Sequence, residues 1–412
     1  IKICFCPFFL YFCLKSICSF LLFSLLLQLK TILNVITFKR KTQPKSKAMK
    51  NILGKAILLA TALLFSITGT SCSNDDNTTP EKEKTYDMSG FAKGADVSWL
   101  TEMEKDGVKF YNQNGKATEC MKLLREEGTN SIRLRVWVNP EGGWCGKDDV
   151  IAKAWRAQQL GFRLMIDFHY SDTWADPGNQ KVPAAWQGYT AEQMKQAVAD
   201  HTKDVLKALK DRGVTNVEWV QVGNETRDGM LWNSDEAVTG QVSKNADNFA
   251  AYINAGYDAV KEVYPNAKVI VHVDQGQDLG GLTWLYDKLK DNDGKWDVIG
   301  LSLYPEDDNW QSYAESCLSN IQTLSSKYGK DVIISEIGMW WGSDQAAPMM
   351  KKMTDGCKKI STCEGIFYWE PEAYNNWKPA NYITLGWEAY TKGAFDNSGK
   401  PTAVFDAYKN IK

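Results

Sequence analysis

Eight short apolar segments alternate with helix-length segments from residue 90 to the end of the chain. The apolar segments are residues 91–97, 131–138, 163–170, 217–222, 268–273, 298–304, 332–337 and 365–369. The helix candidates between them include residues 117–127, 148–159, 191–210 and 247–263. Eight strand–helix units in about 320 residues predict an α/β protein, a single (β/α)₈ TIM barrel over residues 90–412. An open doubly wound sheet is the alternative, but the sequence lacks the Gly-rich phosphate loop usual after its first strand.

Charge and aromatic content narrow the range of functions. Residues 73–412 carry 38 basic and 50 acidic side chains, a net charge of −12. A body with this charge binds polyanions poorly, so we expect no nucleic-acid partner. All 16 Trp lie between Trp99 and Trp387. Such a surplus suits stacking on sugar rings, whose C–H faces are apolar while their edges form hydrogen bonds.

The segment before the barrel predicts export. Residues 49–72 have a basic start, an apolar run and small residues before Cys72, which is the order of a secretory signal. They resemble a bacterial lipoprotein signal with Cys72 as the lipid-bearing residue, and the acidic stretch after it resembles the surface-export tag of Bacteroides-type lipoproteins. We therefore expect an outer-membrane or cell-surface lipoprotein, with residues 73–89 as a flexible tether.

No Met precedes Met49, so residues 1–48 are interpreted as upstream translation from a misplaced start. The alternative is that the apolar run at residues 1–30 is itself a membrane anchor, since it is long enough to span a bilayer.

The cysteines of the barrel region give no sign of a metal site. They are odd in number and show no CxxC or Cys/His zinc spacing, and their pairing cannot be read from the sequence: Cys120, Cys145, Cys317, Cys357 and Cys363. We expect no cofactor and no bound metal, with a structural calcium left open, and we expect a monomer.

Strand alternation directs charged side chains into the barrel. The apolar face of residues 131–138 must pack on the helices, so Arg133 and Arg135 point inward. By the same alternation Asp167 and His169 are inward-facing, and buried charges of this kind must pair. We expect a structural ion pair for Arg133. For Arg135 and His169, which lie nearer the C-terminal strand ends, we expect a role beside the site.

Two glutamates, Glu225 and Glu336, end the fourth and seventh apolar segments. Both are therefore expected at the C-terminal mouth of the barrel, on opposite walls. Glycoside cleavage needs such a pair, one carboxyl protonated to assist the leaving oxygen and the other ionised. A single Glu at a strand end would as readily be the ion-pair partner of an inner Arg. Two in one mouth, beside Asn224 and Trp-rich loops, favour catalysis.

Longer motifs carry a specific resemblance. They are residues 94–98 (GADVS), 133–140 (RLRVWVNP), 167–178 (DFHYSDTWADPG), 183–186 (PAAW), 220–225 (VQVGNE), 367–371 (FYWEP) and 395–401 (FDNSGKP). Over about residues 91–408 the chain resembles glycoside hydrolase family 53, the arabinogalactan endo-β-1,4-galactanases, within a clan of retaining barrel glycosidases. The resemblance implies retaining endo-hydrolysis of β-1,4-galactosidic linkages in the (arabino)galactan side chains of pectin.

The resemblance also implies roles for individual residues. Glu225 would be the acid/base and Glu336 the nucleophile. Asn224 would hold the sugar 2-hydroxyl, Tyr304 would hydrogen-bond the nucleophile, and Trp369 would form the floor under the reacting sugar. The other substrate-binding candidates are Arg135, His169, Trp174, Asp176, Pro177, Gly178, Asn179, His272, Asp274, Gln275, Asp307, Trp340 and Trp377.

Further expectations concern the surroundings of these residues. We expect Arg135 and Tyr304 to hold Glu336 ionised, and the charge of Glu336 to raise the pKa of Glu225. For Trp174, Trp340 and Trp377 stacking on sugar and plain loop packing are both open. His201 follows a helical pattern and is expected at the surface.

The chain departs from the family pattern in two loops. Some members carry a calcium site after strand seven, but residues 338–348 hold a single Asp344, and calcium takes six or more oxygen ligands. Glu306 and Asp307 stand where members often place aromatics, which bears on the distal subsites.

Two other functions stay open. One is a clan-related β-glycanase acting on xylan, mannan or glucan, which residues 167–178 argue against. The other is a non-catalytic glycan-binding lipoprotein, which the presence of both glutamates argues against.

Overall fold

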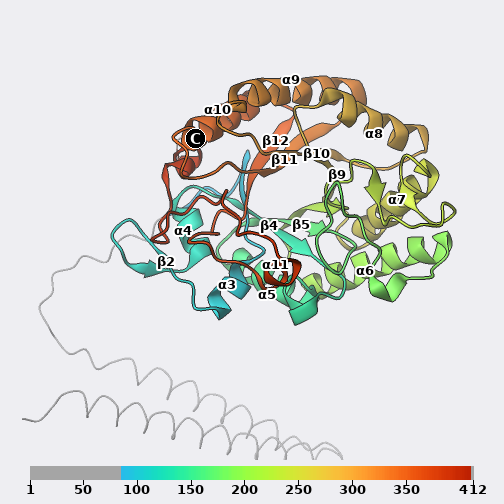
Figure 1. Ribbon diagram of the computed structural model, residues 1–412, viewed down its shortest axis with the longest axis horizontal. Helices are drawn as coiled ribbons and strands as arrows, with labels where there is room; N and C mark the ends of the chain where they lie inside the picture. The colour runs from blue at the N-terminus through green and yellow to red at the C-terminus, as the bar shows by residue number, and fades with distance from the viewer. Residues whose placement is uncertain (1–84, 410–412) are drawn as a thin grey trace, which may run out of the picture. The chain divides into compact units, whose positions relative to one another are not determined.

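The structure, a computed structural model, describes residues 85–409 and confirms the predicted barrel (Figure 1). Eight parallel strands form a closed sheet in the order β1-β12-β11-β10-β9-β6-β5-β4, and β1 pairs with both β12 and β4. Closure leaves no free sheet edge. The barrel strands are β1 (Ala92–Asp96), β4 (Ser131–Val136), β5 (Arg163–Phe168), β6 (Val217–Val222), β9 (Lys268–Val273), β10 (Val298–Leu303), β11 (Asp331–Ile337) and β12 (Cys363–Trp369).

Helices surround the barrel and cover the outer face of its strands (Figure 1). They are α3 (Leu100–Lys105), α4 (Cys120–Glu126), α5 (Lys147–Gln159), α6 (Ala191–Asp211), α7 (Ala246–Val263), α8 (Leu279–Asp291), α9 (Trp310–Tyr328), α10 (Ala346–Lys359), α11 (Ala380–Leu385) and α12 (Asp406–Lys409). Short 3₁₀ turns lie at Glu141–Gly143, Ala184–Trp186 and Ala403–Phe405. Two small hairpins pair β2 (Phe110–Tyr111) with β3 (Ala117–Thr118), and β7 (Gly229–Met230) with β8 (Gly240–Gln241).

Helix α6 shows how the sequence fixes a helix. Thr190 and Gln193 form a capping box that satisfies backbone N–H groups at the first turn. Met194, Val198 and Leu209 belong to one buried stripe facing the barrel. The predicted start of the helix at residues 117–127 was too early. Residues 117–118 form β3, and the side chain of Glu119 caps α4 by accepting from two backbone N–H groups.

The interior of the barrel has an apolar lower layer. Its buried side chains come from seven strands: Ala92, Met165, Trp219, Ile270, Val298, Ile333 and Phe367. The rings of Trp219 and Phe367 meet edge to face with centroids 5.9 Å apart. This layer closes the barrel from below, so that the charged side chains above it face only the C-terminal mouth.

No described helix is long and apolar enough to cross a membrane. The expected signal segment at 49–72, Cys72 and most of the expected tether lie outside the described residues. The five cysteines of the barrel region are free and buried.

The contact between Gly94 and Phe367 gives a stability prediction. A Cβ at residue 94 would lie 2.1 Å from Cδ1 of Phe367, so one of the two must move. We expect Gly94→Ala to lower the free energy of unfolding by about 1–3 kcal/mol because overpacking forces side chains from their rotamers. Urea unfolding of Gly94→Ala, Phe367→Leu and the double variant measures this. The double variant should lose less than the sum of the two, and additive losses would contradict the contact.

Candidate active site

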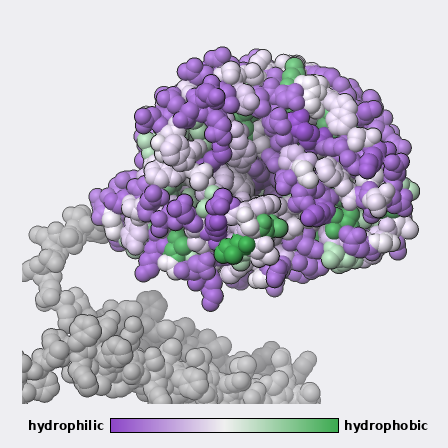
Figure 2. Space-filling view, viewed as in Figure 1, coloured by the Kyte–Doolittle hydropathy of each residue, from purple (hydrophilic) through white to green (hydrophobic). Residues whose placement is uncertain are grey.

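A hollow of about 200 Å³ lies at the C-terminal mouth of the barrel, where TIM-barrel enzymes carry their sites. Five strands, or the loops that follow them, contribute its lining: His169, Trp174, Ala175, Asp176, Asn224, Glu225, Tyr304, Glu336, Trp369, Tyr382 and Trp387. Figure 2 shows a largely hydrophilic face, hollowed near its middle, with hydrophobic groups where Figure 1 draws α11. The structure thus brings both predicted catalytic glutamates into one small cavity.

The two glutamates have different partners. The Ser302 hydroxyl donates to Oε1 of Glu225 at 2.7 Å. The Tyr304 hydroxyl donates to Oε2 of Glu336 at 2.6 Å, as predicted, and Arg133 lies 2.9 Å from Oε1 of Glu336. Glu336 therefore has a cationic partner, whereas Glu225 is held by a neutral hydroxyl.

These surroundings separate the acidities of the pair. Burial and then the charge of Glu336 raise the pKa of Glu225 well above its usual range. Burial also raises the pKa of Glu336, to about 7, while Arg133 and the Tyr304 hydroxyl oppose that rise. Of the two carboxyls, Glu336 is therefore the one that ionises first, and Glu225 is the one that keeps its proton. This is the division that acid-assisted glycoside cleavage needs.

Arg133 lies at the centre of the site. It is fully buried, and its guanidinium contacts Asp96 at 2.7 Å, Asp167 at 2.9 Å and Glu336 at 2.9 Å. The expected structural ion pair is present, but its role is wider than we predicted, because one of its partners is a predicted catalytic carboxylate.

Arg135 does not hold Glu336, so that prediction was wrong. Its guanidinium pairs with Glu370 at 2.9 Å and lies over the Trp174 ring, 4.2 Å from the centroid. Glu370 follows β12 directly, and only β1 separates β12 from β4, so the ion pair places Arg135 beside the aromatic wall. Arg135 therefore supports the pocket from behind rather than lining it.

Several buried neighbours hold Asn224, with Gln221 and His272 each 3.0 Å from its Oδ1. Its Oδ1 accepts from Arg133 at 2.9 Å, and its Nδ2 donates to the Ala175 carbonyl at 2.8 Å. Gln180, which sequence reasoning missed, donates to the Asn224 carbonyl at 2.8 Å. One Nδ2 hydrogen remains available to the cavity, which suits the expected contact with a sugar hydroxyl.

His169 lines the cavity, but both of its ring nitrogens have protein partners. Nε2 lies 3.0 Å from Asp167, while Nδ1 accepts from Trp137 Nε1 at 3.3 Å and from the Ala175 N–H at 3.1 Å. Burial and nearby Arg135 lower its pKa well below the usual range, so the ring is neutral. His169 thus holds the loop after β5 in place.

Aromatic rings form one wall of the cavity. Trp369 meets Trp174 edge to face at 6.0 Å between centroids, and Tyr382 meets Trp174 at 5.5 Å. Trp387 packs on Tyr382 at 5.2 Å. Tyr382 and Trp387 were not predicted. Tyr382 lies on the six-residue helix α11 and Trp387 follows that helix, and a helix this short has no period that would show which rings turn inward.

The predicted residues 176–179 shape the loop after β5. Asp176 lines the cavity, and its side chain accepts from the Gly178 N–H at 2.9 Å. Asn179 Nδ2 donates to the Trp174 carbonyl at 2.5 Å, and Asp176 and Asn179 form a backbone bridge. Pro177 lies inside that turn and, like Gly178 and Asn179, is not among the lining residues.

Other predicted residues lie behind or away from the cavity. His272 is buried behind Asn224, with Nε2 2.7 Å from the Ser302 hydroxyl. Asp274 pairs with Arg227 at 2.5 Å and accepts from Gln275 at 3.1 Å.

The three remaining candidates are peripheral. Asp307 is exposed and accepts from Ser343 at 2.5 Å. Trp340 is 49% exposed. Trp377 donates from Nε1 to Asp106 at 2.9 Å and lines a separate hollow.

His201 is half-buried, less exposed than the surface position that its helical pattern predicted. Its ring packs against Phe168 and Trp186 with centroids 5.6 and 6.1 Å away. Burial lowers its pKa to about 4. The aromatic partners come from other elements, so the helix pattern alone could not reveal them.

Four non-glycine residues at the mouth have left-handed backbone conformations. They are Tyr170 (φ 50°), Glu225 (φ 46°), Gln275 (φ 50°) and Glu370 (φ 44°), and each lies one to three residues beyond a barrel strand. Left-handed backbone is strained for side chains other than glycine and is often found at functional sites. The strain here accompanies the sharp turn that aims Glu225 into the cavity.

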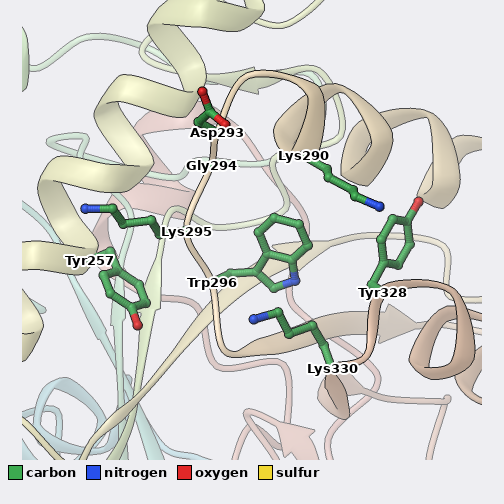
Figure 3. A pocket seen from close by; sticks show the side chains of 8 residues that line it. All are labelled: Tyr257, Lys290, Asp293, Gly294, Lys295, Trp296, Tyr328 and Lys330. Carbon is green, nitrogen blue, oxygen red and sulfur yellow. The ribbon is translucent and has the colours of Figure 1, made fainter.

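A larger hollow of about 460 Å³ lies at the opposite end of the barrel, between α7, α8 and α9 (Figure 3). Trp296 stands at its centre, with Lys330 5.5 Å from the ring centroid. Lys295 pairs with Asp258 at 2.9 Å. The lining contains a single carboxylate, Asp293, and therefore cannot supply an acid and a nucleophile. Size alone does not mark the reactive cavity in this molecule.

Two named relatives are similar to this chain in sequence. The endo-beta-1,4-galactanase of Bacillus subtilis (strain 168) is 30% identical over 341 residues, 74% of this chain and 75% of that protein. The arabinogalactan endo-beta-1,4-galactanase of Thermothelomyces thermophilus is 28% identical over 344 residues, 77% of this chain and 99% of that protein.

Solved structures extend the agreement to the fold. A fungal beta-1,4-galactanase structure matches with a TM-score of 0.68 and 26% identity, covering 78% of this chain and 100% of the other. The catalytic domain of the Ignisphaera aggregans family 53 enzyme gives the same TM-score and identity over 78% of this chain and 96% of its own. The family model described as Glycosyl hydrolase family 53 matches residues 92–408. The chain therefore belongs to glycosyl hydrolase family 53.

Proposed function

We propose that this protein is a retaining endo-β-1,4-galactanase that cleaves the (arabino)galactan side chains of pectin. The observation that carries the proposal is the unequal pair in the mouth, with Glu336 on Arg133 and Tyr304, and Glu225 on the Ser302 hydroxyl. The substrate class is supported by family membership and by the named galactanases among its relatives.

In the proposed reaction Glu336 attacks the anomeric carbon and forms a glycosyl–enzyme bond. The glycosidic oxygen leaves with the proton of Glu225. The Glu225 carboxylate then takes a proton from water, whose oxygen attacks the same carbon and releases Glu336. Asn224, fixed by Arg133 and Ala175, would hold the 2-hydroxyl of the sugar. Trp369 and Trp174 would face its apolar side.

Another β-glycanase activity is the competing function. Incubation of the protein with potato galactan, xylan, mannan and cellulose, followed by product analysis, separates the two. Shortened β-1,4-galacto-oligosaccharides from galactan alone support the proposal. Preferred release of xylo-, manno- or cello-oligosaccharides would replace it.

We further propose that the protein acts outside the cell as a monomeric lipoprotein anchored through Cys72. A polymer must be shortened before it can cross an outer membrane, so an anchored endo-enzyme is useful at that surface. Within residues 85–409 no group of three or more His, Cys, Asp or Glu could hold a metal ion.

Retention gives a geometric and a stereochemical prediction. The carboxyl groups of Glu225 and Glu336 should lie about 5–5.5 Å apart in a crystal structure, because a retaining enzyme needs no room for water between them. Proton NMR of the first product should show the β-anomer before mutarotation. A separation near 9 Å with an α-anomer would establish inversion instead.

The assigned roles predict different defects in two glutamine variants. Glu225→Gln should lower kcat on galactan by about 10²–10⁴-fold yet retain glycosyl–enzyme formation from aryl galactosides with good leaving groups. Glu336→Gln should lose activity on every substrate, since no nucleophile remains. Burst kinetics with an activated aryl substrate distinguish the two. Glu315→Gln, an equal change at an exposed glutamate of α9 that pairs with Lys352, serves as the control. Equal loss from both substrates in the two site variants would contradict the assignment.

Two treatments test the proposed anchor at Cys72 and the expected absence of a structural metal. Cys72→Ala should move the protein from the membrane fraction to the soluble fraction with kcat unchanged, because the anchor is separate from the barrel. EDTA should leave activity and Tm unchanged. A variant that stays membrane-bound would place the anchor elsewhere, and a fall in Tm with EDTA would reveal a structural cation.

A further inference from the structure

A chain of buried hydrogen bonds leads from Arg133 to the acid/base glutamate. Arg133 donates to Gln221 Oε1 at 3.3 Å, and Gln221 Nε2 lies 2.9 Å from Nδ1 of His272. His272 Nε2 lies 2.7 Å from the Ser302 hydroxyl, which donates to Oε1 of Glu225 at 2.7 Å. All of the intermediate side chains are buried. Nothing in the reaction outlined above uses Gln221, His272 or Ser302 directly.

The hydrogen bond from Arg133 to Gln221 fixes which way the following hydrogen bonds point. Arg133 can only donate, so the oxygen of the Gln221 amide faces it and the NH₂ group faces away. That NH₂ group donates to Asp167 Oδ1 at 2.6 Å, and its further neighbours are His272 Nδ1 at 2.9 Å and Asn224 Oδ1 at 3.0 Å. The backbone N–H of Glu225 can only donate and approaches His272 Nδ1 at 3.4 Å, which assigns Nδ1 as an acceptor. Asn224 Oδ1, 3.0 Å from the same Nδ1, accepts from Arg133 instead.

The remaining links follow from the tautomer of His272. Burial and the nearby Arg133 lower its pKa well below the usual range, so the ring is neutral. With Nδ1 accepting, its single hydrogen is on Nε2 and points to the oxygen of Ser302. The Ser302 hydroxyl hydrogen is then directed to Oε1 of Glu225, because its own oxygen is already accepting.

We propose that Ser302, held by His272, is a positioning residue that keeps Oε1 of Glu225 occupied and so places the catalytic proton on Oε2. An oxygen that accepts from Ser302 cannot at the same time direct a proton at the hydroxyl. The proton of the acid form is therefore carried by the oxygen that faces the cavity. After proton transfer the same hydroxyl stabilises the carboxylate. The inference rests on the proposed role of Glu225 as acid/base.

The hydrogen bond from Ser302 changes the pKa of Glu225 in a known direction. The groups that act on Glu225 from the neighbouring elements are Glu336 on β11, Asp274 after β9 and Asp176 after β5, and their charges raise its pKa, as burial does. The Ser302 hydrogen bond is the contribution that lowers it, since it favours the charged form. Tyr304 and His272, the other titratable neighbours, are neutral in the working range. Removing the Ser302 hydroxyl should therefore raise the pKa of Glu225 further.

The test is the pH profile of kcat/KM for Ser302→Ala. The alkaline limb reports loss of the Glu225 proton and should move upward by about 1 pH unit, the size expected for one hydrogen bond to a charged group. At the optimum, kcat on galactan should fall about 10-fold, because the proton is no longer confined to one oxygen. Glycosyl–enzyme formation from an activated aryl galactoside, which needs no acid, should change less than about twofold.

Matched variants separate positioning from loss of structure. Ser335→Ala removes a buried hydroxyl that has no partner in the described structure, one residue from Glu336, and should leave the alkaline limb unmoved. Ser302→Thr keeps the hydroxyl, so the alkaline limb of its pH profile should coincide with that of the wild type. His272→Ala frees the Ser302 hydroxyl to rotate and should shift the limb upward by less than Ser302→Ala.

Two results would overturn the inference. One is an unmoved alkaline limb in a folded Ser302→Ala or His272→Ala variant. The other is an equal fall on galactan and aryl substrates, which would mean a general structural role. The pH profile can be measured on whichever glycan the wild-type protein cleaves. A failure of the galactan assignment, seen with the wild type, is thus distinct from a failure of the positioning role.

Discussion

The site depends on one buried cation. Arg133 is sealed inside the barrel among Asp96, Asp167 and Glu336, three carboxylates that could not remain charged there without it. Taking away one member of such a cluster leaves uncompensated charge in a medium of low polarity, which commonly costs several kcal/mol. The same guanidinium holds the proposed nucleophile and orients Asn224. Folding and chemistry therefore rest on the same contacts and cannot be tuned separately at this residue.

The barrel accommodates the charged cluster around Arg133 because its interior is divided into two layers. Below, Trp219 and Phe367 belong to an apolar layer that excludes water. Above it, polar side chains bond to one another in a network that opens to the mouth, although Nε of Arg133 and of Arg135 and the Ser335 hydroxyl have no partner there. Low local polarity strengthens each of those hydrogen bonds, and it also raises the free-energy cost of each polar group left unpaired. Arg135, paired with Glu370 and covered by Trp174, extends the network to the aromatic wall.

Sequence patterns predicted the strands and the position of both glutamates, because the period of two and the strand ends are local properties. They could not show which arginine meets Glu336. Alternation puts Arg133 and Arg135 on the same face. Only the positions of the other strands decide that Glu370 pairs with Arg135 and that Glu336 pairs with Arg133. Tyr382 and Trp387 were missed because α11, which carries Tyr382, is too short to show a helical period. His201 was misplaced because its partners, Phe168 and Trp186, come from other elements.

The left-handed residues at the mouth bear on attempts to engineer this molecule. Glycine is the residue that such backbone favours, and relief of this strain would be worth of order 1 kcal/mol at each position. A selection for heat resistance alone would thus be drawn toward glycine at residue 225, whereas at residue 370 the loss of the buried ion pair would outweigh that gain. At Glu225 the gain would remove the proposed proton donor, and at Glu370 it would leave Arg135 without its carboxylate. Durable variants with intact turnover are better sought in the outer ring of helices, where rigidity and reactivity do not compete.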